Sequence, residues 1–436
     1  MKKIFSLMLL CAAVVFAGCS KDDDNDPTTP TISVEKVTLS KATLSLKVGG
    51  TETLIATVAP EGVENKTVTW TSSKPAIATI DDKGLVTAIG VGNTTITVTS
   101  VADNTKTATC TVTVKSNEPE FGNEGEEGID GSSWDKAYTI ENKEQLMLLA
   151  TRVKDQNDNW AAKYYKQTAD IALTANDLWI PIGMNSSKTF KGHFDGGNHQ
   201  ITGTLKITTS DMYAGIFGYG YGAEIKNLHF AGSIDLTAST SVSDCAAIIG
   251  DIRIGTISHC SNTADITSAG YAAGIASSVT NSKIIACTNS GSMTATGSSR
   301  KSGGIAAVVY PGNTIIGNIN KGNNFTAPDN AGGIAGYADG TTIACWSLAT
   351  SVTGANSSTA GSIAGMIIGT VTDCYWKEVA DLKGAGYGTI TNTKNNTFTG
   401  DKPSTEQIAA MNAAWQTADP NREYQFNATT GEIEQK

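Results

Sequence analysis

A short residue pattern repeats from about residue 212 onward, with 27 to 32 residues between successive copies. Each copy has a small residue, then glycine or another small residue, then isoleucine. A repeat of this length builds one unit that cannot bury its own apolar side, so the units fold only as a stacked array. The copies begin at Ala214, Ala246, Ala273, Gly303, Gly332 and Gly361.

Two further elements follow the isoleucine in each copy. After about ten residues, an apolar residue precedes a leucine, cysteine or asparagine by three positions, as in Ile257 and Cys260. An apolar residue followed by threonine comes next, as in Ile266 and Thr267. Three short strands per repeat predict one coil of a right-handed, three-sided parallel β-helix, with coils stacked about 4.8 Å apart. The leucine spacing of leucine-rich repeats, the alternative at this repeat length, is absent.

We place this β-helix at residues 134–400 and expect a short capping helix at its start. Asn142 suits the N-cap position, and Gln145 follows three residues later, as in a capping box. The helix would cover the unpaired strands and apolar core at the open end of the tube. Its predicted apolar side consists of Leu146, Leu149, Ala150 and Val153. Residues 401–436 are expected to form a C-terminal cap.

The segment from residue 34 to residue 115 has a different pattern. Apolar and polar side chains alternate with a period of two, as at residues 94–99, and turn-forming residues such as Asp82-Lys83-Gly84 separate the runs. About seven short strands with this spacing predict an immunoglobulin-like β-sandwich. Residues 116–133, rich in glycine and glutamate, are expected to link it to the β-helix. The fold class is therefore all-β.

Two family resemblances agree with this division. Val68-Thr69-Trp70-Thr71-Ser72-Ser73 and Gly84-Leu85-Val86-Thr87-Ala88 resemble the bacterial Ig-like group 2 family, which implies a spacer or adhesion module for residues 34–115. The glycine-rich repeats resemble the GLUG motif family of adhesin-like surface proteins. Residues 190–201, Asp373-Cys374-Tyr375-Trp376 and residues 404–412 resemble the segments that open and close such β-helices. This resemblance implies an architecture and carries no activity.

The N-terminus carries an export signal. Lys2 and Lys3 precede an apolar run over residues 4–16, which is too short to span a bilayer comfortably. The following Ala17-Gly18-Cys19 resembles a bacterial lipobox, although Phe16 stands where leucine is usual. The resemblance implies cleavage of a signal peptide at residues 1–18 and lipidation of Cys19. The alternative is an ordinary secretory signal that is cut nearby.

Residues 19–33 are predicted to be an acidic tether that includes the run Asp22-Asp23-Asp24-Asn25-Asp26. Directly after a lipidated cysteine, this run resembles the signal that sends lipoproteins to the outer face of the outer membrane. The expected location is therefore the outer membrane, lipid-anchored and surface-exposed. The formal net charge of −10 argues against a nucleic-acid partner, because phosphate binding needs concentrated lysine and arginine.

Four cysteines fall at one position of successive coils, and Asn318 occupies the same position in a fifth coil. We expect them to form a buried column inside the tube, with Asn318 as an internal polar member. Zinc binding is the less favoured alternative, because Cys-x-x-Cys spacing is missing. Disulfides are a second alternative, but stacked residues about 4.8 Å apart exceed the usual separation of bridged Cβ atoms. The four are Cys260, Cys287, Cys345 and Cys374.

No catalytic residue, metal site or cofactor is predicted. Asp244, Asp251 and Asp265 come nearest to a carboxylate cluster, with Arg253 as a possible base or clamp, but a surface ion pair is the preferred interpretation. Several aromatic residues could instead stack on sugar rings, and packing at the corners of the coils is their alternative role. The candidates are Tyr213, Tyr219, Tyr221, Tyr310, Tyr337, Tyr375 and Trp376.

The sequence thus predicts a non-catalytic surface lipoprotein. Its β-helix, presented on an Ig-like stalk, would bind host or environmental glycans or matrix proteins. The alternative is a carbohydrate-active β-helix enzyme, either a polysaccharide lyase or a glycoside hydrolase. A lipid anchor, a spacer domain and the lack of a recognisable catalytic motif favour the binding protein.

Lipidation gives the first testable prediction. Replacing Cys19→Ser should abolish acyl labelling, because the cysteine sulfur carries the diacylglycerol in a lipoprotein. Metabolic labelling with radioactive palmitate, followed by isolation of the protein, measures this directly. Label that still enters the Cys19→Ser protein would contradict the assignment.

Overall fold

The computed structural model describes residues 32–117, 120–155, 157–207, 212–236 and 242–436. The predicted signal peptide, Cys19 and nearly all of the acidic tether lie outside these residues. The chain divides into two compact units, residues 1–118 and 119–436.

The first unit is an all-β Ig-like domain, as predicted. Strands β2, β9, β8 and β5 form one sheet in that order, β3, β7 and β6 form a second, and β1 pairs with β4. Leu54, Ile96 and Val112 lie in the core between them, and Trp70 packs partly buried against it. The strands are β1 (Lys36–Leu39), β2 (Thr43–Lys47), β3 (Thr51–Thr53), β4 (Ala56–Ala59), β5 (Val68–Ser72), β6 (Ala78–Ile80), β7 (Leu85–Ala88), β8 (Gly92–Ser100) and β9 (Thr107–Lys115).

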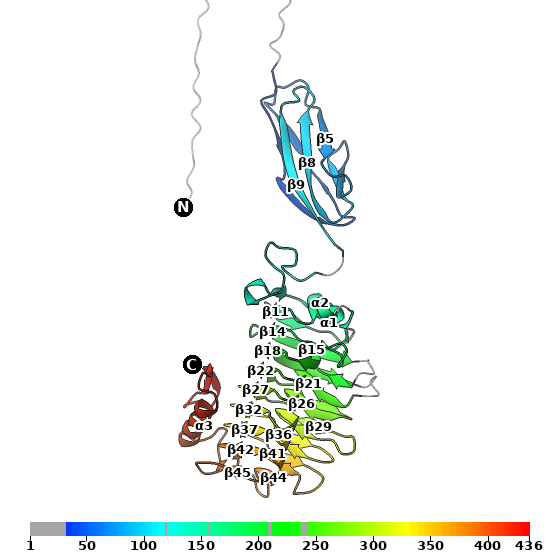
Figure 1. The fold of residues 1–436 in the computed structure, drawn as a ribbon. Helices are drawn as coiled ribbons and strands as arrows, with labels where there is room; N and C mark the ends of the chain where they lie inside the picture. Colours follow the sequence, from blue (N-terminus) through cyan, green and yellow to red (C-terminus); the bar gives the residue numbers. More distant parts are fainter. Residues whose placement is uncertain (1–31, 118–119, 156, 208–211, 237–241) are drawn as a thin grey trace, which may run out of the picture. The chain divides into compact units, whose positions relative to one another are not determined.

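The second unit is a parallel β-helix, whose coils stack along one axis (Figure 1). A complete coil consists of β20 (Asp244–Ala246), β21 (Ile249–Arg253), β22 (Thr256–Ser258), β23 (Ser261–Asn262) and β24 (Ile266–Ser268). The sequence predicted three strands per coil, and the structure has five. Short breaks, such as Ala247-Ile248 between β20 and β21, divide the wall into shorter strands.

Equivalent strands of successive coils pair in parallel and build five sheets, which we name by their first strands. The β16 sheet contains β16 (Tyr213–Ala214), β20, β25 (Tyr271–Ala273), β30 (Ser302–Gly303), β35 (Ala331–Gly332) and β40 (Ala360–Gly361). The β17 sheet contains β17 (Phe217–Tyr221), β21, β26 (Ala276–Thr280), β31 (Ala306–Val309), β36 (Ala335–Ala338), β41 (Ala364–Ile367) and β44 (Ala385–Tyr387).

The other three sheets complete the tube. The β10 sheet contains β10 (Tyr138–Ile140), β11 (Tyr164–Gln167), β14 (His193–Asp195), β18 (Glu224–Lys226), β22, β27 (Lys283–Ile285), β32 (Thr314–Ile316), β37 (Thr341–Ile343), β42 (Thr370–Thr372) and β45 (Ile390–Thr391). The β12 sheet contains β12 (Ile171–Ala172), β13 (Leu178–Trp179), β15 (Gln200–Ile207), β19 (His229–Asp235), β23, β28 (Thr288–Asn289), β33 (Ile319–Asn320), β38 (Trp346–Ser347), β43 (Tyr375–Lys377) and β46 (Thr397–Phe398). The β24 sheet contains β24, β29 (Met293–Ala295), β34 (Asn324–Thr326) and β39 (Ser351–Thr353).

The cysteine column lies inside the tube, as predicted. Cys260, Cys287, Cys345 and Cys374 are buried free thiols. Asn318 is fully buried among them and is satisfied by hydrogen bonds. Its Oδ1 accepts from the Cys287 backbone N–H at 2.8 Å, and its Nδ2 donates to the Ile284 carbonyl at 3.0 Å.

A second buried column consists of amides that the sequence analysis did not find. Asn262 Nδ2 donates to Asn289 Oδ1 at 2.9 Å, and Asn289 Nδ2 donates to Asn320 Oδ1 at 2.9 Å. Asn320 in turn donates to the Ser347 hydroxyl at 3.1 Å. The amides therefore hydrogen-bond from coil to coil through the interior, where an unpaired polar group would be costly.

The repeated glycine makes room for this amide column. A Cβ atom at Gly274 would collide with Asn289 Oδ1, and one at Gly304 would collide with Asn320 Oδ1. The equivalent atom at Gly333 would meet the Ser347 hydroxyl. Glycine before the isoleucine of these three coils is therefore explained by packing inside the tube.

A helix closes the first end of the tube, as predicted. Helix α1 (Lys143–Asp155) buries Leu146, Leu149, Ala150 and Val153 against the interior core. The Asn142 side chain accepts from the Gln145 backbone N–H at 3.0 Å, and the Gln145 side chain accepts from the Glu141 N–H. The 3₁₀ helix η1 (Trp134–Lys136) precedes β10, and α2 (Asn157–Trp160) follows α1 (Figure 1).

The C-terminal segment corrects the prediction of a cap over the other end. Helix α3 (Thr405–Ala418) and the hairpin of β47 (Tyr424–Phe426) and β48 (Ile433–Gln435) lie along the outside of the tube (Figure 1). Met411 and Trp415 pack there against Ile316 and Trp346 from successive coils. The coils expose apolar side chains on this flank, which explains why the segment covers the side of the tube.

The buried thiols give a prediction about reactivity. Burial raises the pKa of Cys260 and Cys374 well above the ordinary value, and only a thiolate reacts readily. All four cysteines of the column are also buried away from the reagent, so they should resist iodoacetamide in the folded protein and react after denaturation without reductant. Mass spectrometry of the labelled peptides measures this. Rapid labelling in the folded state would contradict the inward register.

Candidate functional site

Exposed apolar side chains of the second unit gather along the β17 sheet. Leu178 and Met212 are two of the exposed large apolar residues described in this unit, and they lie elsewhere. The others belong to strands of the β17 sheet or directly follow one. They are Tyr221, Ile254, Tyr310, Ile368 and Tyr387. A run of exposed apolar groups on one wall is typical of a binding surface.

The parallel register aligns tyrosines along this wall. Tyr219 pairs with Asp251, and the same column continues through Ser278, Val308, Tyr337, Met366 and Tyr387. In the adjoining β16 sheet, Tyr213 pairs with Asp244, and Asp244 pairs with Tyr271. We call these seven residues the tyrosine face: Tyr213, Tyr219, Tyr221, Tyr271, Tyr310, Tyr337 and Tyr387.

Two buried carboxylates lie among these tyrosines. Asp244 in β20 is 8% exposed and Asp251 in β21 is 3% exposed. The Asp244 carboxylate accepts from the Ser243 hydroxyl at 2.7 Å and from the Ser277 hydroxyl at 3.2 Å. Small residues at the corner, such as Gly250, let the two strands come close, because a Cβ there would meet the Asp244 carbonyl.

The surroundings shift the pKa of both acids upward. Burial raises the pKa of Asp244 to about 6, and the negative charge of Asp251 adds to the shift, while the bonds from Ser243 and Ser277 oppose it. Burial also raises the pKa of Asp251, and its bond with Arg253 opposes that shift. Asp244 is thus a carboxyl group that changes charge near neutral pH.

Arg253 connects the acids to the aromatic rings. Its Nη2 lies 3.1 Å from Asp251 Oδ2, and its guanidinium lies 5.3 Å from the centre of the Tyr219 ring. Tyr213 and Tyr219 have ring centres 5.2 Å apart. Burial and the charges of Asp251 and Asp244 raise the pKa of Tyr213 to about 12, so its hydroxyl stays protonated. The arrangement offers hydrogen-bond donors, acceptors and ring surfaces together.

Five of the predicted stacking residues belong to this face. Tyr310 is 41% exposed, Tyr337 is partly exposed, and Tyr219 is nearly buried, with Arg253 over its ring. The predicted ion pair between Asp251 and Arg253 forms, but the Asp251 carboxylate is buried and does not lie at the surface as predicted. Asp265 lies apart from this pair, directly before β24 of the same coil, and is exposed.

The structure corrects the other two stacking candidates. Tyr375 is fully buried beneath the C-terminal segment, and its hydroxyl donates to Asp373 at 3.1 Å. Trp376 pairs in register with Ser347, so it points into the tube at the end of the amide column. Neither ring can meet a ligand at the surface of this structure.

Tyr271 and Tyr387 were missed by the sequence analysis. Tyr271 lies five residues before the start of β26, and Asp244 lies five residues before the start of β21. This shared offset could have identified Tyr271. Tyr387 lies in a last coil, Ala385-Gly386-Tyr387, where the motif has lost its isoleucine. No repeat signal marks that strand.

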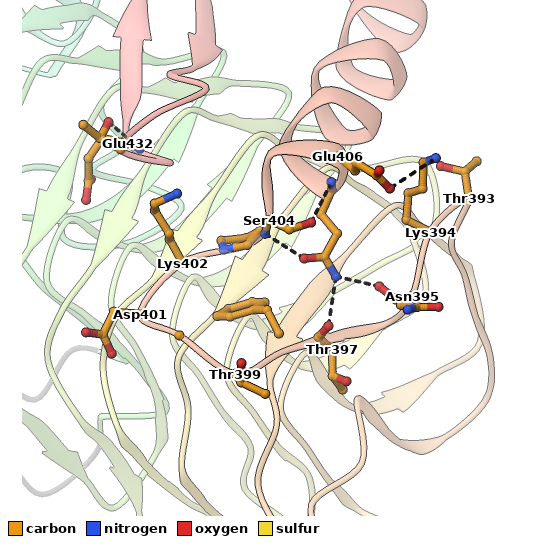
Figure 2. Close-up of a pocket in the computed structure, with 15 residues that line it drawn as sticks. Thr393, Lys394, Asn395, Thr397, Thr399, Asp401, Lys402, Ser404, Glu406 and Glu432 are labelled. Atoms are coloured by element: carbon orange, nitrogen blue, oxygen red, sulfur yellow. Dashed lines mark hydrogen bonds and ion pairs between the residues drawn. The ribbon is translucent and has the colours of Figure 1, made fainter.

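A concavity lies between the last coil and α3, away from the tyrosine face, with a volume of about 990 Å³ (Figure 2). Its charged side chains are largely paired within the chain: Lys394 lies 3.7 Å from Glu406, and Glu432 lies 2.7 Å from Lys321. The Gln407 side chain in the first turn of α3 accepts from the Ser404 backbone N–H and donates to the carbonyls of Asn395 and Thr397 (Figure 2). This cavity lacks the aromatic surface of the tyrosine face.

The fold and face describe a β-helix protein with an Ig-like module, and comparisons with known proteins agree. Residues 33–112 match the bacterial Ig-like domain (group 2). A proposed immunoglobulin A1 protease from Bacteroides ovatus has a similar fold, with a TM-score of 0.50, at 21% identity over 70% of this chain and 94% of that one.

Two curated relatives match over short segments. A 3-O-alpha-D-galactosyl-alpha-L-arabinofuranosidase of Bifidobacterium longum subsp. longum is 50% identical over 70 residues, which is 16% of this chain and 6% of that protein. An Ig-like virion protein of Serratia phage KSP90 is 37% identical over 115 residues, 26% of this chain and 44% of that protein. The chain therefore spans less than half the length of these relatives.

No helix in the described ranges is long and apolar enough to cross a membrane. Within the same part of the chain, no group of three or more histidine, cysteine, aspartate or glutamate residues is placed to hold a metal ion.

The raised pKa of Asp244 predicts a pH-dependent stability. Because the folded pKa of about 6 exceeds the ordinary value of 3.8, the folded protein holds more protons between these values, and stability falls as pH rises from 4 to 6. The loss is on the order of 3 kcal/mol for one group. Asp244→Asn should reduce this slope and raise the free energy of unfolding at pH 7.

Urea unfolding at pH 4, 5, 6 and 7 measures the slope. Asp265 is an exposed carboxylate directly before β24. Asp265→Asn is therefore the matched control and should keep the parent slope. Burial also raises the pKa of Asp251, so part of the pH dependence of stability remains in the Asp244→Asn protein. Equal slopes in the parent and Asp244→Asn proteins would contradict the burial of a titrating carboxyl group.

Proposed function

We propose that this chain is a non-catalytic, lipid-anchored protein of the outer-membrane surface that binds glycans or matrix proteins through the tyrosine face. The observation that carries the proposal is the concentration of exposed tyrosines on one wall of the tube. Tyrosine offers a large ring and a hydroxyl at a low cost in conformational freedom, and it is enriched at binding surfaces.

The Ig-like unit supports a role as a spacer. Its core is complete by itself, with Leu54, Ile96 and Val112 buried in the described residues. A related domain occurs in a glycosidase and in a phage virion protein, so the module is compatible with different partners. In this proposal it holds the β-helix away from the membrane to which Cys19 attaches the chain.

A carbohydrate-active enzyme is the second candidate, and one observation favours it. Asp244 and Asp251 are buried, electrostatically coupled carboxyl groups with raised pKa values, a combination that is typical of acid–base catalysts. Such an enzyme would release new reducing or unsaturated ends from a polysaccharide panel. Asp244→Asn would abolish that release.

Removing an exposed ring tests the binding function. Tyr310→Ala should lower the affinity for the captured ligand by roughly fivefold, because an aromatic contact contributes about 1 kcal/mol. A glycan and matrix-protein array identifies the ligand, and calorimetry on the purified variants measures the affinity. Leu178→Ala, at an exposed apolar residue of the β12 sheet, is the control and should bind like the parent.

Unchanged binding by both Tyr310→Ala and Tyr337→Ala would place the ligand elsewhere on the chain. Equal loss in the Leu178→Ala control would show a general effect on the fold. Thermal unfolding of each variant separates these outcomes from a loss of folded protein.

A further inference from the structure

We infer that the ligand of the tyrosine face is a linear, uncharged glycan that lies parallel to the axis of the β-helix, with about one sugar unit per coil. This inference rests on the proposed function and names the class of ligand. It follows from the spacing, extent and charge of the face.

The spacing comes from the parallel register. Tyr219, Tyr337 and Tyr387 occupy one column of the β17 sheet, so the line joining them crosses the strands and follows the axis. Neighbouring strands lie about 4.8 Å apart. This separation is similar to the length of one pyranose unit in an extended chain, so a linear glycan can meet an equivalent position on each coil.

The extent of the column fixes the length of the ligand. The β17 sheet has seven strands, and exposed rings stand on its first and last strands, Tyr221 in β17 and Tyr387 in β44. Six steps of about 4.8 Å span roughly 29 Å. A single sugar or disaccharide could contact only one exposed ring, whereas a chain of about seven units could contact Tyr221, Tyr310 and Tyr387.

Tyr310 is exposed, and the residues of the two preceding strands in the Tyr337 column are smaller and lie lower. Ser278 and Val308 lie between Asp251 and Tyr337 in the column, and both are nearly buried. Two residues further along the strands, Thr280 pairs with Arg253, and the Tyr310 backbone N–H donates to the Val279 carbonyl at 3.1 Å. The surface therefore presents separated rings along its length, and a glycan can stack on some units while others contact hydroxyl groups.

The charges of the face argue for an uncharged ligand. Arg253 lies 3.1 Å from Asp251, and Lys301 lies 2.7 Å from Asp329. The Tyr337 hydroxyl bonds with Asp339 at 3.2 Å. An acidic glycan would compete with these carboxylates for the cations, whereas sugar hydroxyl groups can donate to carboxylates that stay paired.

Oligosaccharides of graded length test this inference. The probes are cello-, xylo-, manno- and malto-oligosaccharides of two to seven units, with oligogalacturonides of the same lengths as the acidic series, measured by calorimetry on the full chain. At least one neutral series should bind, with a heptasaccharide at least tenfold tighter than a disaccharide. The acidic series should bind at least tenfold more weakly at equal length.

A variant at the end of the column tests the alignment. Tyr387→Ala should make the affinity level off at about five units, because the column then ends near Tyr337. Leu178→Ala, on another sheet, should keep the dependence of the parent up to seven units. Thermal unfolding confirms that both variants are folded.

The outcomes separate the inference from the proposed function. Equal affinity for di- and heptasaccharides, or tighter binding of the acidic series, overturns the axial, uncharged ligand and leaves glycan binding standing. An unchanged length dependence in Tyr387→Ala overturns the alignment. Binding of neither series overturns both the inference and glycan binding as the function.

Discussion

In-register parallel stacking of the coils is the constraint on which the rest of this structure depends. Inside the tube, the bonds from Asn262 to Asn289 and from Asn289 to Asn320 connect three successive coils. A slip of one residue would break these bonds and bury unpaired amides, which is costly in an apolar interior. At Gly274 and Gly304, an added Cβ atom would collide with the amide oxygens of Asn289 and Asn320, so glycine leaves room for the column there.

The same register determines what the outer wall presents. When each coil repeats its position, one outward residue per coil forms a column along the axis, and Tyr219, Tyr337 and Tyr387 share such a column. The corner between the β16 and β17 sheets brings Asp244 and Asp251 under the rings of this wall. In-register stacking therefore determines where both the buried carboxyl groups and the exposed tyrosines of the face lie, while the residue type at each position differs between coils.

The sequence predicted features that repeat and missed features that depend on what covers the wall. The cysteine column, Asn318 and the capping helix followed from spacing and are confirmed. Tyr375 has the alternation of an outward residue, but α3 and its hairpin cover it, and only tertiary packing shows this. Trp376 follows the parity of the amide column, a signal available in the sequence two residues after each cysteine position. The β16–β17 corner, which buries Asp244, depends on small residues whose role appears only when the strands meet.

The most direct test of this account is a crystal structure of the chain bound to a neutral oligosaccharide selected by the length series. We predict sugar rings along the β17 sheet, parallel to the axis, in contact with Tyr310 and Tyr337. Ordered sugar in the cavity beside α3, on the Ig-like unit, or across the strands of the tube would contradict the account.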